Sequence, residues 1–170
     1  MSIVAWEKQE TVGIITMRGG ENRQNPEYVR MMLTVFEEIE QDSEISAVVI
    51  TSSDRKNWSL GIDVQWMAQA MANQDQQAIR DFMYGMNRVY RRILLYPLPV
   101  IAAINGHAFG GGTILACACE FRFMKSDRGF FCFPEIDISI PFLPGMLEII
   151  RKAIPEQKLD MRRGDGFWTI

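Results

Sequence analysis

The sequence predicts an α/β domain over residues 1–154, followed by a short divergent C-terminal tail over residues 155–170. Two continuous apolar runs, residues 45–51 and 99–104, are typical of strands covered on both faces. Each run is followed by a loop and then by helical periodicity, and strands that alternate with helices indicate parallel pairing. At 170 residues the chain is long enough for one domain with a core of ordinary size.

The first half of the chain begins with two strand-like runs. Residues 3–7 and 12–18 are joined by a short polar link, which predicts an opening hairpin. Pro26 suits the first turn of a helix, and apolar residues then recur at spacings of three and four to about residue 41. Beyond the buried run, residues 52–60 predict a loop, and two further helices are expected at about 63–71 and 76–95.

The second half continues the alternation. The run 99–104 leads into a glycine-rich turn and a helix that ends at about residue 118. Short strands are expected at 121–124 and 130–133, and an amphipathic helix at 143–154. Residues 160–170 show no clear periodicity, so we expect a loose tail there.

Composition and charge exclude several classes of function. The net charge of −3 supplies no basic face for nucleic-acid phosphates. Residues 93–119 carry no charged side chain, but prolines and glycines interrupt them, so we expect no membrane span. Cys117, Cys119 and Cys132 lie in apolar surroundings without metal-ligand spacing, which predicts buried thiols in a reducing compartment and no zinc site. No charged leader precedes the first strand, and we expect a cytoplasmic protein.

The turn Asn-Gly-His-Ala-Phe-Gly-Gly-Gly, residues 105–112, is the most informative segment. Bare backbone N–H groups at a helix start bind negative charge, which is either a standing phosphate or an oxyanion formed during a reaction. No lysine follows Gly112, and the glycine spacing fits neither nucleotide-binding motif. The oxyanion interpretation requires a second donor and a nearby base.

Three motifs in order supply both requirements. They are Asn-Trp-Ser-Leu-Gly-Ile-Asp-Val (57–64), the segment 101–112, and Phe-Pro-Glu-Ile-Asp-Ile (133–138). Over residues 3–153 the chain resembles the crotonase (enoyl-CoA hydratase/isomerase) superfamily, closest to the Δ3,Δ2-enoyl-CoA isomerase pattern. The resemblance implies a spiral of β-β-α units, with two roughly perpendicular sheets and surrounding helices. It also implies an acyl-CoA substrate, no cofactor beyond the CoA of that thioester, and a homo-oligomer, either a trimer or a dimer of trimers.

The resemblance also implies roles for individual residues. The backbone N–H groups of Leu60 and Gly111 would hold the thioester oxygen, and Glu135 would be the catalytic carboxylate. Hydratases carry a second glutamate at the position of Ile114, which cannot transfer a proton. Residues implied in substrate binding are Arg23, Ser59, Gly61, Ile62, Asp63, Gly110, Ile114 and Pro134, with no metal ligand among them.

One carboxylate is enough to move a double bond, because it can take a proton from carbon 2 and return it to carbon 4. We therefore expect an isomerase. A hydratase, with Asp137 or a water in place of the missing glutamate, is the second interpretation. A catalytically inert acyl-CoA-binding protein is the third. The apolar setting of Glu135 should raise its pKa and improve it as a base near neutral pH.

Other polar residues have ordinary interpretations. His107, beside the glycines, is expected to be packed or hydrogen-bonded, and Asp63 to cap a helix. Arg23 and Lys56 lie on loops that approach CoA in this superfamily. Because crotonases continue with further C-terminal helices, their absence would expose apolar surface near Phe142, Leu143 and Ile149.

Overall fold

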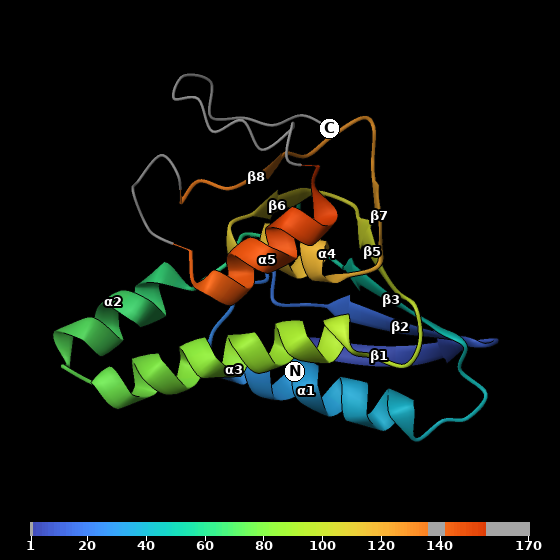
Figure 1. Ribbon diagram of the computed structural model, residues 1–170, viewed down its shortest axis with the longest axis horizontal. Helices are drawn as coiled ribbons and strands as arrows, with labels where there is room; N and C mark the ends of the chain where they lie inside the picture. The colour runs from blue at the N-terminus through green and yellow to red at the C-terminus, as the bar shows by residue number, and fades with distance from the viewer. Residues whose placement is uncertain (1, 136–141, 156–170) are drawn as a thin grey trace.

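The computed structural model describes residues 2–135 and 142–155, which form two β-sheets and the helices around them (Figure 1). The larger sheet has the strand order β1-β2-β3-β5-β7. Its strands are β1 (Val4–Gln9), β2 (Val12–Met17), β3 (Ala47–Ser52), β5 (Val100–Ile104) and β7 (Phe121–Met124). The predicted hairpin is the antiparallel pair β1 and β2, and the later strands pair in parallel.

The smaller sheet contains β4 (Asn57–Ser59), β6 (His107–Phe109) and β8 (Phe131–Cys132), all paired in parallel. The prediction of an unbroken loop over residues 52–60 is wrong, because β4 lies within it. The prediction that residues 105–110 form only a turn is also wrong, because β6 occupies half of them. Strands of two or three residues are too short to produce a periodic pattern in a sequence.

The helices agree closely with the prediction. They are α1 (Pro26–Glu40), α2 (Val64–Ala72), α3 (Gln76–Leu94), α4 (Gly111–Ala118) and α5 (Pro144–Ala153). Side-chain oxygens cap three of their N-termini: Asn25 accepts from the Tyr28 N–H, Asp63 from Trp66 and Asp75 from Ala78, each at 3.0 Å. These caps satisfy amides that have no partner within the helix, and they explain where each helix begins.

Three similar units succeed one another along the chain. In each unit a strand of the larger sheet is followed by a strand of the smaller sheet and then by helix: β3-β4-α2, β5-β6-α4 and β7-β8-α5. This is the β-β-α spiral that the resemblance implies. Because β4, β6 and β8 are parallel, their carboxyl ends lie at the same edge of the smaller sheet, and the chain leaves each strand toward the next helix at this edge.

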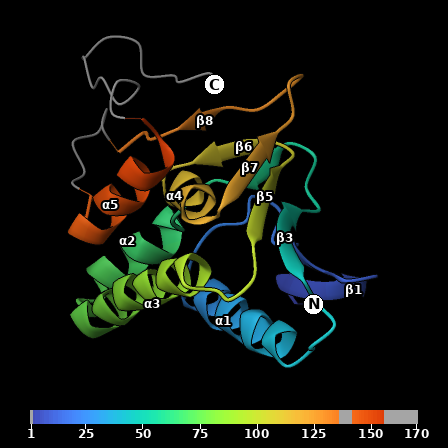
Figure 2. The same ribbon diagram turned by 45° about the vertical axis from the view of Figure 1, so that its right-hand side comes forward.

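The core is one continuous cluster. Helix α1 packs against β1, and α3 packs side by side with α1 (Figures 1 and 2). Helix α4, in which every residue is buried, is enclosed by α5, α3 and the smaller sheet, as Figure 2 shows with this helix viewed nearly end-on. Helix α4 carries no charged side chain. A buried charge without a partner at this place would strongly destabilise the folded protein.

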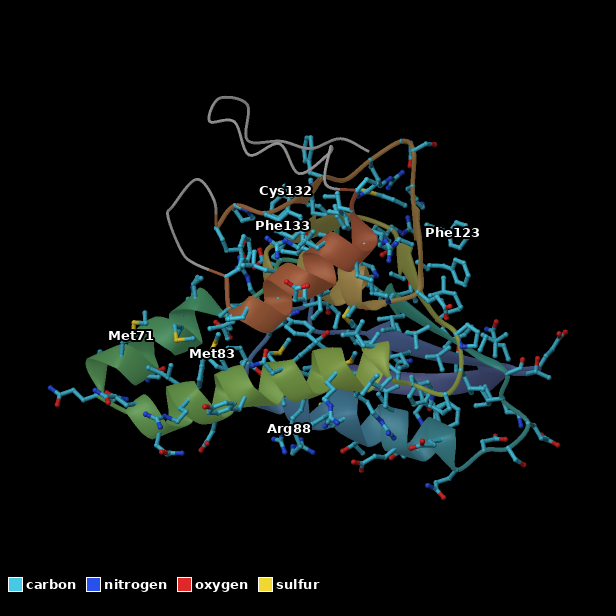
Figure 3. The ribbon with its side chains drawn as sticks, viewed as in Figure 1. Met71, Met83, Arg88, Phe123, Cys132 and Phe133 are labelled. Atoms are coloured by element: carbon cyan, nitrogen blue, oxygen red, sulfur yellow. The ribbon has the colours of Figure 1, made fainter. Side chains whose placement is uncertain are left out.

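Apolar surface is exposed only partly where it was expected. Leu143 is 37% exposed, as expected. Ile149 is buried, and the ring of Phe142 packs edge-on against Phe133 at 5.8 Å. Phe121 and Phe123 on the edge strand β7 are instead 51% and 66% exposed, and Figure 3 shows Phe123 projecting away from the sheet. The expectation for Ile149 was therefore wrong, since α5 turns this residue inward.

Within residues 2–135 and 142–155, no helix is both long enough and apolar enough to span a membrane. The three cysteines are buried, as expected. Burial raises the pKa of Cys117 and Cys119 to about 12, so both remain protonated near neutral pH.

Candidate active site

The turn after β4 and the turn before α4 are in direct contact. Gly61 has φ +76°, and a Cβ on it would lie 2.7 Å from the Phe109 carbonyl oxygen and 2.8 Å from the Gly111 nitrogen. Only glycine allows both this backbone conformation and this approach. Two loops separated by about fifty residues in sequence are thereby brought to one point, as the oxyanion interpretation requires.

The donor that the resemblance implies in the first turn, Leu60, already has a hydrogen-bond acceptor within the protein. The Leu60 N–H already donates to the Glu21 carbonyl at 3.0 Å, so it cannot serve a ligand at the same time. Family resemblance located the correct turn, but the direction of each N–H within it depends on hydrogen bonds that the sequence does not display.

Ile62 supplies the open amide of this turn. Gln24 pairs with the chain on both sides of Ile62: its N–H donates to the Gly61 carbonyl, and its carbonyl accepts from the Asp63 N–H, both at 2.8 Å. In a parallel bridge of this pattern, the intervening residue directs its own N–H away from the partner strand. No acceptor for the Ile62 N–H occurs among residues 2–135 and 142–155.

The second donor is the first residue of α4. Gly110 has φ +53° and precedes the helix without a side-chain cap, and its carbonyl accepts the first helical hydrogen bond from the Ile114 N–H at 3.0 Å. The Gly111 N–H belongs to the first turn and has no partner within the helix. The positive end of the helix dipole adds to its attraction for an oxyanion.

Glu135 lies over this helix start. Its Oε1 is 2.5 Å from where a Cβ on Gly110 would be, so a side chain at position 110 would displace the carboxylate. Oε2 is buried and has no hydrogen-bond partner in the described residues. Burial raises the pKa of Glu135, which agrees with the expectation from its apolar setting. A partly desolvated carboxylate beside two open amides can act as a proton-transferring base.

Ile114 lies one turn along α4 from Gly110 and is 2% exposed. The position where a second carboxylate would lie in a hydratase is therefore filled by a packed apolar side chain. Asp137, the other candidate for that task, lies outside the described residues, as does the tail from residue 156 onward.

The remaining predicted residues support the loops. The Ser59 hydroxyl donates to the Asn22 carbonyl at 2.9 Å, and Asp63 caps α2 as expected. Arg23 pairs with Glu21 at 2.9 Å and reaches the Ile62 carbonyl at 3.4 Å, so its guanidinium lies at the rim of the same turn. Pro134 is half-buried directly before Glu135.

His107, the only histidine of the chain, is held as expected. Its Nδ1 accepts from the Phe130 N–H at 3.2 Å, and its ring stacks on that phenylalanine. A ring nitrogen engaged in this way is occupied in holding β6 to the segment before β8.

Two residues near the helix start were not predicted. Gln24 is fully buried, with its carboxamide against Gly111, and the Tyr90 hydroxyl donates to the Gly111 carbonyl at 3.4 Å. Burial, and then the charge of nearby Glu135, raise the pKa of Tyr90. Neither residue belongs to a motif, and only the folded chain brings them to α4.

The fold and this arrangement of turns define a crotonase-type protein. Residues 7–161 match the sequence model of the family described as enoyl-CoA hydratase/isomerase. The chain belongs to this enzyme family.

Similar proteins include both isomerases and hydratases. The chain is 31% identical over 154 residues to enoyl-CoA delta isomerase 2, peroxisomal, of Arabidopsis thaliana, covering 87% of this chain and 62% of the relative. It is 34% identical over 141 residues to short-chain-enoyl-CoA hydratase of Clostridium acetobutylicum, covering 81% of this chain and 51% of the relative. The chain therefore spans roughly half to three-fifths of the length of these relatives.

Solved structures show the same fold. A crystal structure from Legionella pneumophila, described as an enoyl-CoA hydratase/isomerase (crotonase), superposes with a TM-score of 0.82 at 26% identity. The match covers 95% of this chain and 61% of the other. The described arrangement is therefore the shared part of a larger crotonase architecture.

Proposed function

We propose that the protein is an enoyl-CoA isomerase that moves a double bond from 3-enoyl-CoA to 2-enoyl-CoA. The observation that supports this is the carboxylate of Glu135 over a helix start that carries two open amides, with Ile114 at the position of a hydratase's second carboxylate; among the described residues no other carboxylate lies there. The similarity to a delta isomerase over most of the chain agrees with it.

The geometry supports the following sequence of steps. The Ile62 and Gly111 amides hold the thioester oxygen, which withdraws electron density from carbon 2. Glu135 removes a proton from that carbon, and the charge spreads over a dienolate that the same amides stabilise. The carboxylic acid then returns the proton to carbon 4, so no other acid, metal or resident cofactor is needed. The acyl-CoA is the partner, and Arg23 at the rim of the turn is a candidate contact for its phosphates.

The test is the conversion of 3-hexenoyl-CoA to its 2-enoyl isomer, followed by chromatography. We expect turnover by the wild type and a loss of about 10²–10⁴-fold in Glu135→Gln, because the amide cannot accept the proton. Leu60→Ala is the matched control in the same loop. Its backbone N–H can still donate to the Glu21 carbonyl, so this variant should retain activity. Full activity in Glu135→Gln would rule the proposal out.

A hydratase is the second candidate, and the 34% identity to a short-chain hydratase favours testing it. Crotonyl-CoA is incubated with the protein, and the absorbance of the 2-enoyl thioester is followed. Rapid loss of that absorbance would favour hydration. Tight binding of both thioesters without turnover would instead support the inert acyl-CoA-binding interpretation.

Assembly and location follow only from the resemblance. A homo-oligomer, as a trimer or a dimer of trimers, is proposed on this basis, and light scattering of the purified protein would test it. A cytoplasmic location stays a prediction.

A further inference from the structure

Gln24 is a buried polar side chain whose carboxamide atoms have no hydrogen bond among the described residues. The residue is 0% exposed, and both its Nε2 and its Oε1 lack a hydrogen bond. Among the described residues only two other buried side-chain atoms share this condition, Asn105 Oδ1 and Glu135 Oε2. Since folded proteins rarely keep buried polar groups unsatisfied, a carboxamide with two open atoms indicates a missing partner.

The open carboxamide lies at the start of α4. It packs against the position where a side chain on Gly111 would begin, and the Tyr90 hydroxyl is 3.5 Å from the same position. The nearby hydroxyl protons are directed elsewhere: Tyr90 donates to the Gly111 carbonyl and Tyr28 to the sulfur of Met17. The Tyr28 side chain is also close enough to Gln24 to offset part of the rise that burial causes in the Tyr28 pKa. Even so, neither carboxamide atom has a hydrogen bond of normal geometry among the described residues.

The backbone of Gln24 fixes this location. Its N–H and its carbonyl hold Gly61 and Asp63, the residues on either side of Ile62. One residue thus organises the turn of the first amide donor with its backbone and touches the second donor, Gly111, with its side chain. The carboxamide is therefore close to the residue whose amide would hold a ligand oxygen.

We propose that Gln24 is a further catalytic residue, whose Nε2 donates a third hydrogen bond to the thioester oxygen beside the Ile62 and Gly111 amides. This rests on the enolate chemistry of the proposed function. The carboxamide oxygen and nitrogen exchange places by rotation, so the amino group can face Gly111. Side-chain amides serve in oxyanion sites of this kind, and such a donor acts most strongly once the oxygen carries negative charge.

The test replaces Gln24 by methionine, which keeps an unbranched side chain of similar length and removes both polar atoms. Exchange of the carbon 2 protons of hexanoyl-CoA in D₂O, followed by NMR, measures enolate formation without requiring a double bond. Isomerisation of 3-hexenoyl-CoA is measured in parallel. We expect both rates to fall by about 10²–10³-fold. KM should stay within about threefold.

Thermal unfolding separates this role from a structural one. Removing an unpaired buried amide should leave Tm equal or higher, so a slower but equally stable variant supports the proposal. Gln24→Leu, which differs in shape but also lacks the amide, should lose activity to a similar extent. Wild-type rates in the methionine variant with an unchanged or raised Tm would overturn the proposal.

Failure of the isomerase assignment would be recognised separately. If the wild type binds hexanoyl-CoA but neither exchanges its protons nor isomerises 3-hexenoyl-CoA, the proposed function fails. Calorimetric binding of hexanoyl-CoA then decides the role of Gln24. Weaker binding by Gln24→Met would support a donor to the thioester oxygen, and equal binding would overturn it.

Discussion

Glu135 combines a carboxylate with surroundings that oppose its charge. Because burial raises its pKa, the folded state holds this proton more tightly than the unfolded state does. The group must lose the proton to act as a base. We therefore expect kcat/KM to rise with pH and to level off above the raised pKa, with its midpoint above the value of about 4.3 for an ordinary glutamate.

The same shift has a consequence for stability. Glu135 contributes stability that is fully present below its unfolded-state pKa and is lost as pH rises through its folded-state pKa. Glu135→Gln should not show this loss. As pH increases, the Tm of the wild type should therefore fall relative to the Tm of the variant. A pH-independent difference would contradict the assignment.

Gly61 tests whether contact between the two turns is required. Alanine at this position would meet the Phe109 oxygen and the Gly111 nitrogen in addition to adopting a left-handed backbone. The backbone alone costs about 1–2 kcal/mol, and displacement of the Gly111 amide should lower kcat by about 10²-fold or more.

Gly20→Ala is the matched control for this substitution. Gly20 has φ +64° but no atom within 4 Å of its missing Cβ, so alanine there introduces backbone strain without a clash. It should destabilise the protein by about 1–2 kcal/mol and leave kcat unchanged. Equal losses of activity in both variants would show that strain, rather than the meeting of the turns, is responsible.

Among the elements, the N-terminal cap of α2 is closest to the site. The Asp63 carboxylate accepts from the Trp66 N–H and from the Asn25 side chain, while its own N–H is held by Gln24. Asp63→Ala should cost about 1 kcal/mol and also lower kcat, because the Ile62 amide lies next to it.

Asp75 caps α3 in the same way, far along the chain from the site turns. Asp75→Ala should cost a similar amount, about 1 kcal/mol, with unchanged kcat. Chemical denaturation and steady-state kinetics on the two variants provide the comparison. Equal kinetics would contradict a role for the α2 cap in positioning the amide.

The elements also show how far sequence reasoning extends. The apolar spacing from Val29 to Ile39, the proline at position 26 and the capping role of Asp63 predicted helices correctly, because each of these signals is local. The smaller sheet was missed because its strands are short. The resemblance implied Leu60 as the donor and Ile62 only as a substrate-binding residue. The direction of each amide depends on hydrogen-bond partners, Glu21 and Gln24, that are distant in sequence. Gln24 was not predicted for the same reason, because only the folded chain brings it to the start of α4.

At the scale of the whole molecule, the edge strand β7 carries two exposed aromatic side chains. Phe121 and Phe123 lie on one face of this strand, which ends the larger sheet beside β5 in the part of the chain that the structure describes (Figure 3). Such an edge promotes pairing between copies. Phe121→Thr with Phe123→Thr should reduce concentration-dependent association in sedimentation velocity.

Leu95→Thr is the control for this prediction, since it removes one exposed apolar side chain outside the sheet. It should leave association unchanged. Because all three positions are exposed, stability should change by no more than about 0.5 kcal/mol for each substitution. Undiminished association of the double variant would show that copies meet elsewhere.

The smaller sheet consists of strands of only two or three residues, yet all three turns that carry the proposed chemistry leave from it. Few backbone bonds hold this region, whereas long strands and two packed helices hold the larger sheet. Regions with few bonds open at a lower free energy than the molecule as a whole. On gradual heating, activity should therefore be lost at a temperature at which most of the circular dichroism signal persists. Cooling from that temperature should restore the activity.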